Sequence, residues 1–208
     1  MESSKGHLLP IAYLAPISYY AILLQNINVK IEIQEYFIKQ SIRNRCYIYA
    51  SNGILTLSVP RKRKSNNKIP VKEVQISYTE NWQKKHWKTI QSAYNSSPFF
   101  EYYKDEISPF YKMKYSNLID FNCQLQECII NLLGIEYEQS FNSSYQSKPK
   151  EIDYRNYKFI NDIIPSYIQV FNKKYGFINN LSIIDLLFNL GPESLDYLKN
   201  IKLIDKKQ

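Results

Sequence analysis

The stretch KQSIRNRCYIYASNGILTLSVP, residues 39–60, decides the fold of this chain. Asn52-Gly53 lies between two runs in which apolar and polar residues alternate, which is the strongest short-range signal for a β-hairpin. We predict a hairpin over 45–59 with a two-residue turn at Asn52-Gly53, which places Ala50 opposite Leu55. One face then carries the apolar side chains Cys46, Ile48, Ala50, Leu55, Leu57 and Val59, and the other face is polar.

Arginine is scarce in this chain, and two arginines lie at the start of the hairpin. Arg43 and Arg45 are two residues apart, so on a regular strand they point the same way. A guanidinium group is a planar fork of donors that matches carboxylate or phosphate. We therefore predict that Arg43, Arg45 and Lys39 bind an anionic substrate. The alternatives are a solvated sheet face, or an internal ion pair with an acid such as Glu32 or Glu35.

The composition indicates a packed globule. The 208 residues are 44% hydrophobic and 15% aromatic, which suits a single domain over 1–208. The net charge is +8, but lysine is abundant together with Asn, Ile and Tyr, and such a general bias spreads lysine over every exposed face. Nucleic acid is therefore the less favoured partner. The basic run at 61–67 (RKRKSNN) fits a solvated loop better than a nucleic-acid site.

Metal and cofactor chemistry have little support in the sequence. The cysteines Cys46, Cys123 and Cys128 have no CxxC spacing and are typical of reduced thiols in a cytoplasmic protein. Only His7 and His86 could supply imidazole to a metal. The GxSxG, GxGxxG, Walker and HExxH motifs are absent, so we expect neither metal nor cofactor.

The apolar run at 8–24 imitates an export signal, but Pro10 and Pro16 interrupt it. We expect a buried strand followed by a helix there, and no transmembrane segment.

Strand-like and helix-like segments alternate along the chain, which favours an α/β or α+β fold with a mixed sheet. Besides the hairpin, we expect strands at 8–14, 29–33, 71–77 and 135–141. We expect helices at about 17–24, 81–94, 98–106, 117–133, 183–190 and 192–200. Ser182-x-x-Asp185 reads as a capping box for the fifth of these helices. Residues 142–150 are the best candidate for a mobile loop or linker.

His86 is the candidate base. It lies four residues after Trp82 on one face of the predicted 81–94 helix, and Tyr94 follows near its end. Imidazole is the side chain best suited to proton transfer near neutral pH. The alternative is a histidine packed at the edge of the core and bonded to the backbone.

Several stretches taken together resemble the WbqC-like protein family. They are PIAYLAPISYY (10–20), KQSIRNRCYI (39–48) with LTLSVP (55–60), NWQKKHWKTIQSAYNSSPFF (81–100) and FINNLSIIDLLFNLGPESLDYL (177–198). Many relatives carry a His-Gln-Pro-x-Tyr-x-Pro run near the N-terminus, where this chain has Ala12-Tyr13-Leu14-Ala15-Pro16. Because this chain lacks that histidine, His86 becomes the main candidate for a catalytic histidine.

The resemblance implies a transferase of O-antigen or other surface-polysaccharide biosynthesis that moves glycine or a similar acyl group onto a sugar. Acyl transfer to an amine needs a base and oxyanion donors. His86 and Asn44 are the candidates for these catalytic roles, and Arg43, Arg45, Lys39, Trp82 and Tyr94 are the candidates for binding an anionic or nucleotide-linked substrate. The alternative is a non-catalytic binding module for a nucleotide-sugar, a glycan or RNA.

Overall fold

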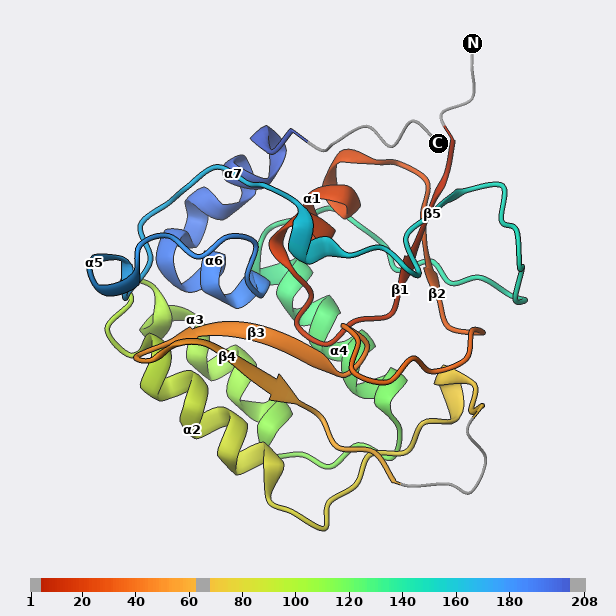
Figure 1. The fold of residues 1–208 in the computed structure, drawn as a ribbon, viewed down its shortest axis with the longest axis horizontal. Helices are drawn as coiled ribbons and strands as arrows, with labels where there is room; N and C mark the ends of the chain where they lie inside the picture. The colour runs from red at the N-terminus through yellow and green to blue at the C-terminus, as the bar shows by residue number, and fades with distance from the viewer. Residues whose placement is uncertain (1–4, 63–67, 203–208) are drawn as a thin grey trace.

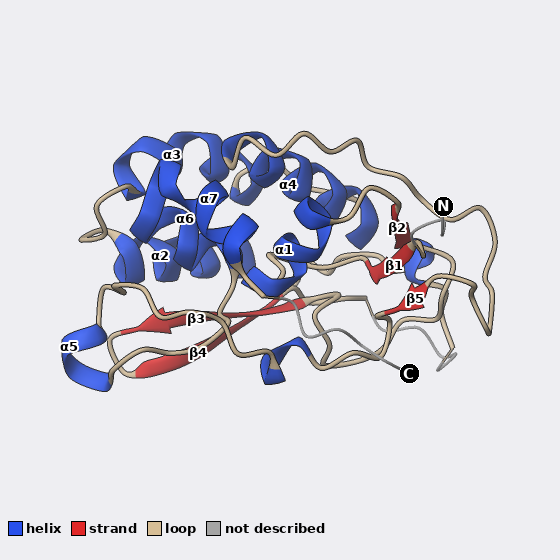
Figure 2. Cartoon of the chain, turned by 90° about the horizontal axis from the view of Figure 1, so that it is seen from above, coloured by secondary structure: helices blue, strands red, loops and turns tan. Residues whose placement is uncertain are grey.

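The computed structural model describes residues 5–62 and 68–202 (Figure 1). Its strands form a three-stranded parallel sheet and a separate two-stranded antiparallel sheet. Helices α2 (Trp82–Tyr94), α3 (Phe100–Ile107) and α4 (Leu118–Leu132) lie on one side of the antiparallel hairpin (Figure 2). The predicted α/β class is confirmed, although the strands divide into two sheets instead of joining one. Residues 63–67 of the basic run lie outside the described residues.

The parallel sheet has the strand order β2-β1-β5. Its strands are β1 (His7–Pro10), β2 (Val29–Glu32) and β5 (Ile152–Asp153), and helix α1 (Ile17–Gln25) connects the first two. A helical crossover is the usual connection between parallel neighbours. The first strand ends four residues before the predicted end at Leu14, which has a positive φ of 43° that no regular strand accommodates.

The hairpin consists of β3 (Arg45–Ala50) and β4 (Gly53–Ser58). Ala50 pairs with Gly53 and Cys46 with Leu57, so the turn is at Ser51-Asn52 and the predicted register is wrong by two residues. The cause is Gly53, which has a φ of 97° and begins the second strand instead of closing the turn. A shift of two residues keeps the alternation of side chains between the faces. However, Leu55 of the predicted core face is 37% exposed, and Tyr49 of the predicted polar face is fully buried, because residues 171–176 cover it.

Of the three central helices α2, α3 and α4, the first and the third begin at their predicted caps, whereas the second begins two residues after its predicted start and has no side-chain cap. The Asn81 side chain accepts a hydrogen bond from the backbone nitrogen of Lys84 at 3.4 Å, and Asn117 does the same for Asp120 at 2.9 Å. Short 3₁₀ helices occupy Val71–Glu73, Ser108–Tyr111, Phe159–Asn161 and Gly191–Glu193.

The C-terminal helices are α5 (Asn172–Tyr175), α6 (Ile183–Leu190) and α7 (Ser194–Asn200). The predicted capping box at the start of α6 is wrong. The Ser182 hydroxyl donates to the carbonyl of Leu14 at 2.9 Å instead of capping the helix. Asp185 points into the core and is fully buried.

Two predicted strands are wrong. Residues 71–77 begin with a 3₁₀ turn and then make isolated bridges, of Gln75 with Asn117 and of Ile76 with Arg61. Residues 135–141 make one bridge, between Phe141 and Ile31. Each segment pairs with its neighbours only at single residues, so no continuous ladder of hydrogen bonds forms. Residues 142–150 contain no regular element, and their mobility stays a prediction.

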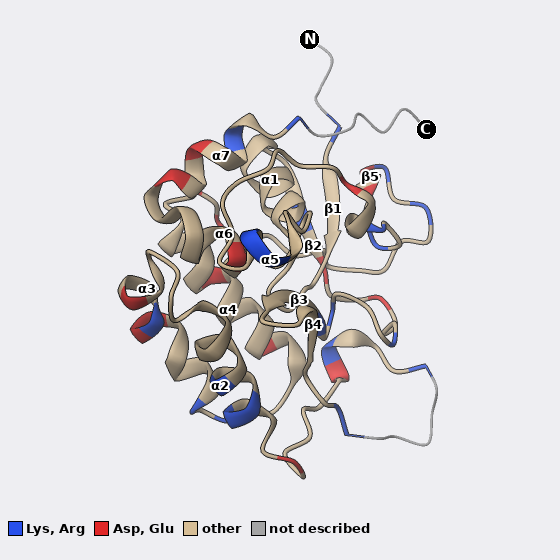
Figure 3. Ribbon diagram, turned by 60° about the vertical axis from the view of Figure 1, so that its left-hand side comes forward, with Lys and Arg blue, Asp and Glu red and all other residues tan. Residues whose placement is uncertain are grey.

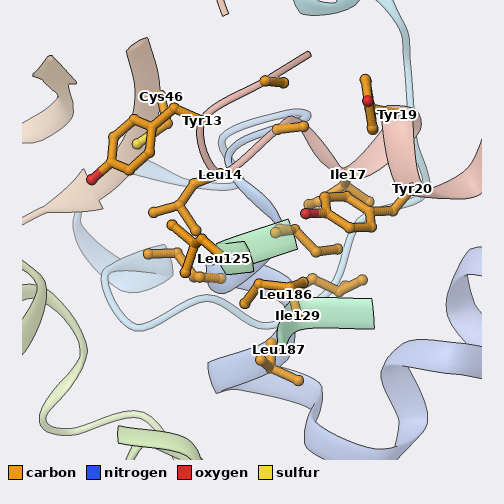
Figure 4. Packing of buried hydrophobic residues seen from close by; sticks show 14 of the residues in the cluster. Tyr13, Leu14, Ile17, Tyr19, Tyr20, Cys46, Leu125, Ile129, Leu186 and Leu187 are labelled. Carbon is orange, nitrogen blue, oxygen red and sulfur yellow. The ribbon is translucent and has the colours of Figure 1, made fainter. Parts of the chain in front are cut away.

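One large core joins both ends of the described chain. Tyr20 and Ile17 of α1 face Leu186 of α6 and Ile129 of α4 (Figure 4). Helix α1 is apolar all round because neighbours cover every side of it, so all residues from Ile17 to Leu23 are buried. Within the described ranges, no helix is both long and apolar enough to span a bilayer.

Candidate functional site

The carboxyl ends of the three parallel strands meet at one edge of the sheet. Glu32 is the last residue of β2, and Glu35 follows it in the next loop. Asp153 ends β5, and Arg155 comes two residues later. Ligands of open α/β sheets bind beyond the carboxyl ends of the strands. This edge therefore holds a concentration of charged groups at the place where such folds carry their sites.

Arg43 reaches this edge from the turn that precedes β3. Its Nε and one terminal nitrogen donate to the two carboxylate oxygens of Glu35, each at 2.7 Å. The same terminal nitrogen also donates to the carbonyl of Arg155 at 3.0 Å. The Arg43 side chain is 2% exposed and that of Glu35 is 6% exposed. The internal ion pair with Glu35, which was one of the sequence-based alternatives, is therefore present.

Arg155 is held in a similar way. Its Nε and a terminal nitrogen donate to Asp153 at 2.9 and 2.7 Å, and its other terminal nitrogen lies 3.4 Å from Glu32. Glu32 is fully buried and also accepts from the Asn142 side chain at 2.7 Å. The guanidinium lies 5.0 Å from the ring centre of Tyr145, within the range of a cation–π contact. The first residue of the 142–150 loop is thus tied to the charge cluster.

Burial raises the pKa of Glu35 to about 7. The Arg43 guanidinium opposes this shift, and the nearby Glu32 carboxylate adds to it. The cluster sets two arginines against three acids, Glu32, Glu35 and Asp153. A proton on Glu35 would therefore leave the cluster neutral, which reduces the repulsion that an incoming anion meets.

A cavity of about 330 Å³ opens next to this cluster. Arg43 and Arg155 form part of its wall, together with the lysines Lys39 and Lys158. Both lysines are exposed, and neither makes an ion pair among the residues that the structure describes. Its remaining lining is largely apolar or aromatic, including Pro16, Ile38, Ile42, Tyr47, Tyr157, Phe159 and Ile160. The cavity thus offers two free cations beside an apolar wall, which suits an organic anion.

One larger groove has a different charge balance. At the opposite edge of the sheet a groove of about 780 Å³ carries three lysines and three glutamates, whose charges cancel: Lys5, Lys30, Lys150, Glu136, Glu138 and Glu151. Over the described ranges, no three His, Cys, Asp or Glu side chains come together as metal ligands. The strand-end cavity is our candidate site because it lies beyond the carboxyl ends of the parallel strands and is lined by two arginines as well as two lysines.

Of the predicted site residues, the binding candidates Lys39 and Arg43 line this cavity, whereas the binding candidate Arg45 and the catalytic candidate Asn44 do not. Because β3 begins at Arg45, Arg43 lies in a turn and the two guanidinium groups do not share a strand face. Arg45 Nε is buried with no hydrogen-bond partner among the described residues. The Asn44 amide already donates to the carbonyl of Val59 at 3.0 Å. The expected clamp by both arginines is absent.

His86, Trp82 and Tyr94 lie elsewhere, on the α2 side of the hairpin. The Nδ1 atom of His86 is 3.1 Å from the Tyr13 hydroxyl, which is 2.8 Å from that of Tyr111. The Trp82 ring packs edge-on against the imidazole, with ring centres 5.1 Å apart. The expectation that His86 and the arginines share one cavity is not met. The catalytic roles of His86 and Asn44 stay predictions.

Burial lowers the pKa of His86 to about 4, from an ordinary value of 6.5. Between these values the unfolded chain binds more protons than the folded chain, so the stability must fall as the pH falls. We expect this histidine alone to lower the free energy of unfolding by about 2 kcal/mol between pH 7 and pH 5. Urea unfolding of the wild type and of His86→Gln at both pH values measures it. An equal pH dependence in the two proteins would contradict the prediction.

Sequence reasoning missed two groups. Arg155 is one of the few arginines of the chain, and that scarcity was the available signal. Asp185 was assigned to a helix cap, yet its carboxylate accepts from the hydroxyls of Tyr94 and Tyr167 at 2.9 and 2.5 Å and from the Gln169 amide at 2.8 Å. Burial raises the pKa of Asp185. An acid in the apolar run IIDLLFNL (183–190) was the signal for a buried carboxylate.

The fold and the cluster define a mixed α/β protein with an ion-paired cavity beyond its parallel strands. The sequence model of the WbqC-like protein family matches residues 12–156 and 150–197, and the chain belongs to this family. It is also 28% identical over 197 residues to the uncharacterized protein Rv1507c of Mycobacterium tuberculosis, with 78% of this chain and 84% of that protein covered. No solved structure matches the chain.

Proposed function

We propose that this protein is a transferase of O-antigen or other surface-polysaccharide biosynthesis that moves a glycyl or similar acyl group onto an amino sugar. The nucleotide-linked substrate binds in the strand-end cavity. In this reaction the sugar amine bonds to the acyl carbon, the bond from the acyl group to its carrier breaks, and the amine releases a proton. Membership of the WbqC-like family supports the biosynthetic role.

The observation that carries the proposal is the cavity itself. Lys39 and Lys158 are exposed cations without an acid partner in the described part of the chain, whereas the wall residues Arg43 and Arg155 are each held by carboxylates. Phosphate groups bind to such clusters of charge-assisted donors. Tyr47 and Tyr157 give the same cavity aromatic surface for the remainder of a nucleotide.

The binding part is tested with UDP as the probe, by isothermal titration calorimetry. We expect Lys39→Ala combined with Lys158→Ala to weaken binding about tenfold or more, because two positive charges leave the cavity. The matched control is Lys88→Ala, an exposed lysine of α2 outside this cavity. The proposal fails if UDP does not bind, or if the control weakens binding equally.

The transfer step is tested by mass spectrometry of a UDP-linked amino sugar after incubation with the protein and a glycyl thioester. The amide forms as the thiol leaves, so a gain of one glycyl residue supports the transferase. UDP binding without product favours the alternative, a non-catalytic binding module. One observation favours that alternative: His86, the predicted base, does not line the cavity.

A further inference from the structure

The segment 156–178 exposes an unusual set of apolar side chains. Ile163 is 80% exposed, Ile168 is 81% exposed and Ile160 is 50% exposed. Nearby, Ile38 is 38% exposed and lines the strand-end cavity together with Ile160. Isolated exposed apolar residues are ordinary, but a group of them on one surface indicates an interaction site.

The same segment is basic. It contains Lys158, Lys173 and Lys174, and its one acid is Asp162. The Asp162 carboxylate already accepts a hydrogen bond from the Tyr157 hydroxyl. Helix α5, which carries Lys173 and Lys174, is drawn mostly in blue in Figure 3. Lys39 adds a further exposed cation at the cavity. Apolar and cationic side chains are therefore interspersed with almost no negative charge.

The segment lies on the hairpin side of the molecule. Lys174 donates to the carbonyl of Ser51 in the hairpin turn at 3.0 Å, and the Tyr49 hydroxyl donates to the carbonyls of Phe171 and Gly176 at 3.1 and 2.9 Å. Helices α2, α3 and α4 lie on the other side (Figure 2). These hydrogen bonds hold residues 171–176 of the segment against the hairpin, and Ile160 of the same segment lines the candidate site.

We propose that this face, made of residues 156–178 with Ile38 and Lys39, binds the surface of an anionic lipid bilayer. Isoleucines enter the boundary between headgroups and acyl chains, and lysines pair with the headgroup charges. Lysine is depleted from the centre of protein–protein interfaces, which favours a bilayer over a protein partner. The inference is independent of the transfer reaction. It places the mouth of the cavity at a membrane surface.

Co-sedimentation with vesicles tests the proposal. We expect the wild-type protein to bind vesicles of phosphatidylcholine mixed with phosphatidylglycerol, and to bind phosphatidylcholine alone much more weakly. Ile163→Ser with Ile168→Ser should weaken binding about tenfold or more, since both side chains lose their apolar contact. Lys158→Glu with Lys173→Glu should do the same, and added salt should weaken wild-type binding.

The controls are Ile27→Ser and Lys88→Glu, which change an isoleucine that is 94% exposed and an exposed lysine, both on other parts of the surface. They should leave binding unchanged. The proposal is overturned if anionic vesicles do not bind, or if the controls weaken binding as much as the paired variants. It is also overturned if Ile163→Ser with Ile168→Ser dissociates a dimer in analytical ultracentrifugation, because the face would then join two copies of this chain.

Discussion

Arg43→Ala is expected to lower the free energy of unfolding by about 3–5 kcal/mol, because it leaves the buried Glu35 carboxylate without its cation. Glu35 is only 5% exposed, so water cannot replace the lost guanidinium. The neighbouring carboxylate of Glu32 makes an unpaired charge there still less favourable. Urea unfolding at neutral pH measures the effect.

The pH dependence of this loss has a definite sign. In the wild type the pKa of Glu35 is raised to about 7, so between about 4.5 and 7 the folded protein holds more protons than the unfolded chain. Stability from this group therefore falls as the pH rises through that window. Without Arg43 the pKa rises further. We expect the destabilisation by Arg43→Ala to be smaller at pH 5 than at pH 8, because a protonated Glu35 needs no cation.

Two comparisons isolate the ion pair. Lys39→Ala removes a cation from the same cavity but from an exposed position, and should change stability by less than about 0.5 kcal/mol. Adding Glu35→Gln to Arg43→Ala removes the unpaired charge and should restore part of the lost stability. The assignment is contradicted if Arg43→Ala costs no more than Lys39→Ala, or if the second substitution restores nothing.

Asp185→Ala is the second change with a large expected effect, a loss of about 3–5 kcal/mol in the free energy of unfolding. It removes the acceptor of three donors, namely the buried hydroxyl of Tyr94, the half-buried hydroxyl of Tyr167 and the buried amide of Gln169. The Tyr94 hydroxyl also accepts a hydrogen bond from the backbone nitrogen of Tyr49 in β3. A displaced Tyr94 would therefore weaken the attachment of the hairpin as well. The network joins α2, α6, the hairpin and the 156–178 segment.

Asp185→Asn keeps the shape and one acceptor oxygen, so we expect it to cost about 1–2 kcal/mol, less than the alanine variant. Asp196→Ala, which changes an aspartate of α7 with an 80% exposed side chain, is the matched control and should be nearly neutral. Urea unfolding of the three variants ranks them. If Asp185→Ala were as mild as the control, the carboxylate would not be the centre of a stabilising network.

These two buried clusters explain how the candidate site is held. Arg43 forms part of the cavity wall, and its ion pair with Glu35 fixes the position of its guanidinium group. The Asp185 network anchors Tyr167 and Gln169, which follow the wall residues 155–160 within the same segment of the chain. Loss of either cluster is therefore expected to weaken ligand binding in two ways. It displaces the side chains of the cavity wall, and it lowers the fraction of folded protein. Binding measurements on such variants are best made where unfolding is negligible.

Short-range signals predicted the elements that depend on near neighbours. The asparagine caps fixed the starts of α2 and α4, and the Asn-Gly pair located the hairpin within two residues. The failures have long-range causes. Residues 71–77 and 135–141 have strand-like patterns, but a ladder needs a partner that only the assembled fold supplies. Ser182 fits a capping box, yet the carbonyl of Leu14 takes its hydroxyl.

The residue types and their local periodicity by themselves determined the α/β class, the main helices and the place of the hairpin, and they marked Arg43 as a candidate site residue. Only the tertiary structure decided which acid Arg43 pairs with, because the choice of Glu35 depends on how the loop after β2 packs. Arg155 reaches Arg43 because β5 pairs with β1, which lies far away in the sequence. The tertiary structure also decided that His86 lies in an aromatic core and not beside the arginines. A side chain's partner, its burial and hence its pKa are properties of the packed chain, and no local pattern contains them.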